Sequence, residues 1–142
     1  MYPRAAHVAA LCLLVLGCSA DPALPSDVAD AGPEAVALSD GQLLQMVVYT
    51  TPDQPPTRGL STVIMHVTDA KTGAPQDGLQ VAALPWMPAH GHGTTIKTAI
   101  EAKGGGTYVI SRVNMFMGGK WDLRLSFSGS VNDRAALHFE IP

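Results

Sequence analysis

At 142 residues the chain has room for one domain with a single core. Its formal net charge of -3, with nine scattered Lys and Arg residues, excludes a nucleic-acid surface, which needs clustered positive charge. Eleven prolines and fourteen glycines among 46% hydrophobic residues indicate short buried segments joined by turns, which favours an all-β domain over a helical one.

The N-terminus has the pattern of a bacterial export signal. Arg4 precedes Val8–Leu16, an apolar run that is too short to cross a bilayer as a permanent helix. Val15-Leu16-Gly17-Cys18 resembles the lipobox, in which a small residue precedes a cysteine that is lipidated and becomes the mature N-terminus. We therefore predict a lipoprotein signal peptide over residues 1–17 and lipidation of Cys18. The alternative is ordinary cleavage shortly after Cys18, which would release a soluble protein.

The retained cysteine and the segment after it support anchoring. Cys12 would leave with the signal peptide, so Cys18 has no partner for an internal disulfide. Residues 18–40 contain three prolines and several acidic residues without apolar alternation, which predicts a disordered tether. The predicted location is the cell envelope, with the domain held by the bilayer at the periplasmic face or at the outer membrane.

A folded domain is predicted over residues 41–142. Apolar and β-branched residues form seven short segments separated by turns: 43–50, 60–69, 79–83, 94–100, 107–117, 120–127 and 134–141. Pro85 is expected to end the third of these strands. About seven strands without a helix predict an immunoglobulin-like antiparallel β-sandwich, with an open barrel as the alternative. Since the Cys-Trp-Cys signature of antibody domains is missing, only the architecture is inferred.

Histidine and methionine residues at two places suggest a metal site. His90 and His92 stand at i and i+2 between Gly91 and Gly93, and Met87 lies just ahead of them. In an extended backbone, such residues point the same way with Cα atoms about 6.5 to 7 Å apart, so both imidazoles can meet one ion. Glycine leaves the loop free to bend toward a ligand.

Met115 and Met117 repeat this spacing beside Gly118 and Gly119. Thioether sulfur is a soft ligand that selects Cu(I), and methionine does not form disulfides in an oxidising compartment. Copper is therefore the predicted cofactor, bound by His90, His92 and one or more of Met87, Met115 and Met117. Zinc is second, since the two histidines have no third histidine, cysteine or carboxylate nearby in the sequence.

Plainer interpretations of these residues remain open. Met115 and Met117 follow Val109 and Val113 in phase, so both methionines are equally well explained as core residues. The histidines can be two exposed loop residues. His66 and His138 alternate on strand faces and receive no role.

The sequence predicts no enzymatic activity. There is no visible nucleophile beside a base and no pair of carboxylates suited to acid-base catalysis. Gly104-Gly105-Gly106 lacks the lysine and the helix of a phosphate-binding loop and is better explained as a hairpin turn.

Three segments resemble the YtkA-like domain, which is related to FixH-type domains. They are Trp86 to Gly93, Gly105-Gly106-Thr107-Tyr108 and Val113 to Leu123, which match an M-P-x-M/H-x-H-G run, a G-x-Y turn and an M-x-G-x-W strand start. The resemblance spans roughly residues 42 to 141. It implies a small exported β-sandwich and, by association with copper handling and oxidase assembly, a metal role for Met87, His90, His92 and Met117. His90 stands where the family often has methionine, which shifts the expected preference toward Cu(II) or toward both oxidation states.

The sequence thus predicts an exported, membrane-anchored lipoprotein that binds copper through a His/Met site as a buffer or chaperone, with a copper-accepting protein as its partner. The alternative is a non-catalytic immunoglobulin-like interaction module, in which Trp86, Met87 and the histidine loop form a protein-binding tip without metal.

Overall fold

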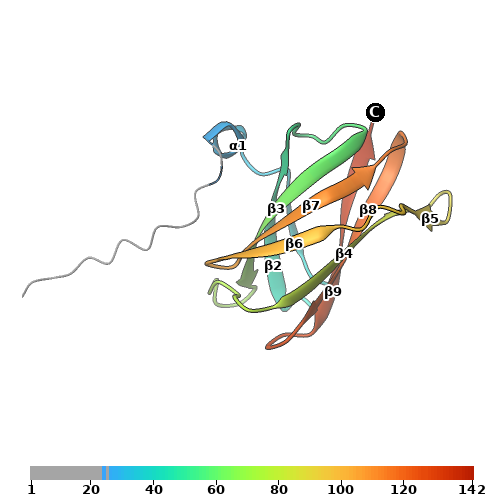
Figure 1. Ribbon diagram of the computed structural model, residues 1–142. Coiled ribbons are helices and arrows are strands. Elements are labelled where there is room, and N and C mark those ends of the chain that lie inside the picture. The colour runs from blue at the N-terminus through green and yellow to red at the C-terminus, as the bar shows by residue number, and fades with distance from the viewer. Residues whose placement is uncertain (1–23, 25) are drawn as a thin grey trace, which may run out of the picture.

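The structure, a computed structural model, describes residue 24 and residues 26–142. The described residues form a short helix and nine strands arranged as a β-sandwich (Figure 1). The elements are α1 (Ser26–Ala31), β1 (Ala35–Leu38), β2 (Leu44–Thr51), β3 (Gly59–Asp69), β4 (Gln80–Met87), β5 (His92–Gly93), β6 (Ala99–Gly104), β7 (Thr107–Met115), β8 (Gly119–Ser128) and β9 (Asp133–Ile141). The signal peptide and Cys18 lie outside the described residues and stay predictions.

The strands form two antiparallel sheets. One has five strands in the order β1-β2-β3-β7-β6, and the other has four in the order β5-β4-β8-β9. Without the edge strands β1 and β5, the order β2-β3-β7-β6 opposite β4-β8-β9 is that of a constant-type immunoglobulin domain. The predicted immunoglobulin-like sandwich is confirmed, with nine strands where the sequence predicted about seven.

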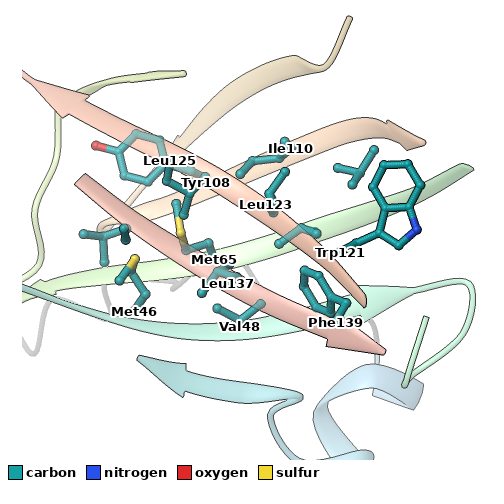
Figure 2. Close-up of a cluster of buried hydrophobic side chains, with 14 of the residues drawn as sticks. Met46, Val48, Met65, Tyr108, Ile110, Trp121, Leu123, Leu125, Leu137 and Phe139 are labelled. Atoms are coloured by element: carbon teal, nitrogen blue, oxygen red, sulfur yellow. The ribbon is translucent and has the colours of Figure 1, made fainter. Parts of the chain in front are cut away.

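The core lies between the sheets and follows the alternation of the sequence. On β8, Trp121, Leu123, Leu125 and Phe127 are all buried, and the residues between them face outward. Figure 2 shows Trp121, Leu123 and Leu125 packing with side chains from both sheets, including Met46, Met65 and Leu137. Trp121 lies at one end of this core, where its Nε1 donates a hydrogen bond to the carbonyl of Met117 at 2.9 Å. Burial of an indole is favourable when its N–H finds such a partner.

The predicted tether was wrong for the described residues before 41. Residues 26–31 form α1, and β1 pairs with β2 through the register Ala35↔Val48 and Ala37↔Met46. Ala35 and Ala37 pack against the core, and Val28 of α1 is buried. Alanines that alternate with larger apolar residues can form an edge strand when an adjacent strand has unpaired backbone N–H and C=O groups. The composition of the segment alone does not show that such a strand lies beside it.

Two strand boundaries also differ from the prediction. The strand expected over 94–100 lies at Ala99–Gly104 instead, because pairing with β7 determines where it forms. β4 continues through Pro85 to Met87, with Pro85 opposite Leu123 of β8. β5 covers only Trp86 and Met87 on the other side of β4, so the missing N–H donor of proline is tolerated at that edge.

Among the described residues, no helix is long and apolar enough to cross a membrane.

Candidate metal centre

The histidines lie on a tight hairpin between β4 and β5, which projects from the side of the sandwich in Figure 1. The carbonyl of Met87 accepts hydrogen bonds from the backbone N–H groups of His90, at 3.2 Å, and Gly91, at 2.9 Å. Gly91 has φ 66°, a left-handed conformation that glycine adopts without steric cost. The chain therefore reverses within four residues and returns beside β4.

This reversal places Met87 directly opposite His92 in the ladder. Opposed residues of an antiparallel pair project from the same face, with Cβ atoms about 4.5 to 5.5 Å apart. Met87 faces the core and is 2% exposed, so His92 points to the inner side of the sheet edge, where it is half-buried.

The His90 ring lies close to that of His92. The two ring centroids are 5.6 Å apart and the ring planes meet at 69°. The predicted extended backbone at this pair was wrong, because His90 belongs to the turn and only His92 belongs to a strand. The two imidazoles are nevertheless neighbours, and His90 is the exposed member.

The ring of His92 has one nitrogen engaged by the protein. Its Nδ1 lies 3.0 Å from the carbonyl oxygen of Gly93. A carbonyl oxygen only accepts hydrogen bonds, so Nδ1 carries the proton in the neutral ring and the lone pair is on Nε2. Metal-bound histidines commonly have this arrangement, with the second nitrogen donating to a carbonyl that orients the ring.

The second methionine segment lies at the same end of the sandwich as the histidine hairpin. Phe116, between Met115 and Met117, stacks on His92 with ring centroids 6.1 Å apart and an interplanar angle of 21°. Phe116 also meets Trp121 edge to face at 5.6 Å. The two segments, more than 20 residues apart in the chain, are joined by these aromatic contacts. Both segments therefore lie at one end of the sandwich.

A second contact joins the same two segments. The Cε atom of Met87 lies only 2.9 Å from the position that a Cβ atom on Gly119 would occupy. Gly119 has φ 115°, so it is suited to this place both by conformation and by its lack of a side chain. The methyl end of Met87 therefore lies against the first residue of β8, two residues after Met117.

The three methionines differ in burial. Met87 and Met115 are 2% and 1% exposed and belong to the hydrophobic core, whereas Met117 is half-buried against it. Met115 has the position of a core residue. Met87, although buried, begins the histidine hairpin, and Met117 follows Phe116, which stacks on His92, so these two are the sulfur ligands that this geometry favours.

A family model for YtkA-like proteins matches residues 42–126, which is more than half of the chain. The chain belongs to the YtkA-like family. All five residues predicted as metal ligands lie within the matched range. Neither the curated proteins nor the solved structures include a match.

Histidine, cysteine and carboxylate side chains do not by themselves form a metal site in the described part of this YtkA-like domain. In the part of the chain that the structure describes, no three His, Cys, Asp or Glu side chains are grouped as a metal site requires. A centre formed by His90 and His92 therefore needs thioether ligands or a ligand from outside the described residues.

Sequence reasoning did not find Phe116 and Gly119, which join the two halves of the candidate centre. The sequence feature that could have pointed to Phe116 is its place between Met115 and Met117. If both methionines face the core, the residue between them faces outward, and Phe116 is indeed 46% exposed.

His138, for which no role was predicted, lies with its Nδ1 2.7 Å from a carboxylate oxygen of Asp122. That pair lines a hollow of about 510 Å³ beside Pro88 and Ala89 of the hairpin.

Proposed function

We propose that this YtkA-like protein is an exported, lipid-anchored copper-binding protein that buffers copper or passes it to an acceptor protein. The observation that carries the proposal is the opposition of Met87 and His92 across the β4–β5 hairpin, with the His90 ring beside them. This arrangement presents a soft thioether and two imidazoles from one short segment.

The residues fit copper on their own chemistry. Thioether sulfur and imidazole nitrogen are ligand types that suit copper. Neither contains a thiol, which must lose its proton before it can bind a metal. The Nε2 lone pair of His92 is available because Nδ1 donates to Gly93. Copper would supply a Lewis-acid centre that exchanges ligands, and the protein would supply the orientation of the two rings and the sulfur.

The exposure of the site suits exchange of metal with a partner. His90 is exposed at the tip of the hairpin, His92 is half-buried and Met87 is buried. The ligands thus form a gradient from solvent toward the core, so an acceptor can replace the outermost ligand first. A binding role without catalysis agrees with this arrangement, in which a metal would be held at a surface.

The test is a Cu(I) competition titration on the domain beginning at residue 26, since α1 and β1 belong to the fold. The double variant His90→Ala/His92→Ala is compared with His138→Ala, a matched histidine on the outer face of the same sheet. Tight binding that the double variant loses and His138→Ala keeps supports the proposal. Equal and weak binding by all three proteins contradicts it.

The second candidate is a protein-interaction module without metal, and two aromatic residues favour it: Phe116, which is exposed, and Trp86, which is half-buried. Phe116 is 46% exposed at the hairpin, and Trp86 lies on the outer face of the sheet with the Arg124 guanidinium carbon 4.7 Å from its ring centroid. Capture of the same partner with and without a copper chelator, lost on Trp86→Ala, would support this function in place of copper binding.

A further inference from the structure

The candidate metal centre and the N-terminal entry of the chain lie at the same end of the sandwich. We define the His end by the loops of residues 52–58, 88–91 and 116–118. The ladder pairs Gly59↔Met115 and Gly119↔Ile141 place the starts of β3 and β8 together with the ends of β7 and β9 there. The opposite end, the far end, is formed by residues 39–43, 70–79 and 129–132.

The N-terminal helix is attached to the His end. The side-chain nitrogen of Gln54, in the loop of residues 52–58, donates a hydrogen bond of 2.6 Å to the carbonyl of Gly32, just after α1. The backbone N–H of Glu34 donates to the carbonyl of Val48 at 2.8 Å, which starts β1 beside the last part of β2. α1 therefore lies at the end that carries His90 and His92.

The chain between the predicted anchor and the domain is short. Ser26 is eight residues after Cys18, and a fully extended chain spans at most about 3.6 Å per residue, so the helix starts within about 29 Å of the lipidated cysteine. The strands are about as long as this distance, since the ten residues of β8 extend about 30 Å. Attachment of so short a tether at this end favours an orientation with the His end nearer to the membrane than the far end.

The surface of the His end is compatible with a lipid surface. Leu60, at the start of β3, is 58% exposed, and Phe116 is 46% exposed. The charged residues in its three loops are Asp53 and Arg58, and both are bonded within the protein: Thr57 donates to Asp53 at 2.7 Å, and Arg58 Nε donates to the carbonyl oxygen of Pro142 at 2.7 Å. Exposed apolar side chains beside charged groups that are hydrogen-bonded within the protein are compatible with the boundary of a bilayer.

We propose that the protein is held with its His end against the bilayer that carries its anchor, so that the copper ligands face the membrane surface. This inference rests on the lipid anchor of the proposed function and is independent of whether copper binds. In this orientation, the site is presented to an acceptor embedded in the same membrane.

The experiment uses the protein as it is exported from cells, purified with its native lipid and reconstituted in vesicles of phosphatidylethanolamine and phosphatidylglycerol in the presence of a copper chelator. Because the lipoprotein prediction has Cys18 acylated and Cys12 removed with the signal peptide, one introduced cysteine carries a fluorophore at a single place. Ala89→Cys labels the His end and Ser130→Cys labels the far end; both positions are exposed. Energy transfer to an acceptor dye on the lipid headgroups reports the distance of each label from the membrane.

We expect stronger transfer from Ala89→Cys than from Ser130→Cys. Leu60→Glu should reduce transfer from the Ala89 label, whereas Leu43→Glu, which changes a 46% exposed leucine at the far end, should not. Equal transfer from both labels, or stronger transfer from Ser130→Cys, would overturn the orientation. A protein that does not stay with the vesicles would overturn the anchor itself. Neither result bears on copper affinity, which the titration of the isolated domain measures separately.

Discussion

Met87 and His92 form the pair of the β4–β5 ladder next to the turn, and both side chains project from the face that points toward the core. This relationship brings a thioether sulfur and an imidazole together from one short hairpin. The contacts of His92 with Phe116 and of Met87 with Gly119 then fix the hairpin against the loop that contains Met117.

His92→Ala should weaken Cu(I) binding at least as much as His90→Ala, and each by about tenfold or more, in the range seen when groups supporting a metal site are removed. The reason is that His92 is half-buried and its ring is oriented by the carbonyl oxygen of Gly93, whereas His90 is exposed. Competition titration of each single variant measures this. If His90→Ala weakens Cu(I) binding more than His92→Ala does, then His90, and not His92, is the more important histidine ligand.

Met87→Leu and Met115→Leu should separate a ligand from a core residue. Both are buried, and a swap of similar volume usually costs less than about 1.5 kcal/mol, so urea unfolding should show little change in stability for either. Cu(I) affinity should fall for Met87→Leu and stay unchanged for Met115→Leu. Equal losses of affinity in both variants would show that Met115 also binds the metal.

Gly119→Ala should destabilise the domain by about 1 to 3 kcal/mol, because alanine is strained at φ 115° and its Cβ would meet the Met87 methyl group. Gly73→Ala is the control: its φ is also positive, at 72°, but nothing lies within 4 Å of the added atom. We expect a smaller loss there, near 1 kcal/mol. Urea midpoints compare the stabilities, and only Gly119→Ala should also lower copper affinity.

Removal of residues before 41 should destabilise the domain relative to a chain that begins at residue 26. The buried backbone N–H of Leu44 donates to the Ser39 hydroxyl at 2.9 Å, and loss of that acceptor costs about 1 to 3 kcal/mol. β1 and its alanines are lost as well. Chemical denaturation of the two chains tests this, and equal midpoints would mean that the N-terminal strand contributes nothing.

Asp133 should make the domain sensitive to acid. A hydrogen bond from the Ser39 hydroxyl, at 2.6 Å, is the largest cause that lowers the pKa of Asp133 below its ordinary value, and backbone N–H groups of Arg134 and Gly41 add to it. A carboxyl with a lowered folded-state pKa stabilises the protein above its unfolded-state pKa. That contribution is lost as the pH falls through the folded-state pKa.

Asp133→Asn should therefore lower stability at neutral pH and reduce the decline of stability on acidification below the ordinary pKa of aspartate. Asp40→Asn, at an exposed aspartate in the adjacent loop, is the control. Thermal unfolding followed between neutral pH and strongly acidic pH measures both. An unchanged pH profile in Asp133→Asn would contradict this role.

The sequence by itself determined the sandwich and the residues that form its interior. Alternation such as Trp121, Leu123, Leu125 and Phe127 has a period of two, so it decides both strand structure and the buried face. The His/Met segments were also evident from the chain, since spacing and residue type are local properties.

Only the tertiary structure decided which of those residues meet. The opposition of Met87 and His92 depends on the register of a four-residue turn, and the stacking of Phe116 on His92 depends on how two sheets pack, neither of which is encoded in local spacing. The same holds for β1, which forms because β2 offers a free edge. The attachment of α1 at the His end is likewise a long-range relationship, made by the hydrogen bond between Gln54 and Gly32.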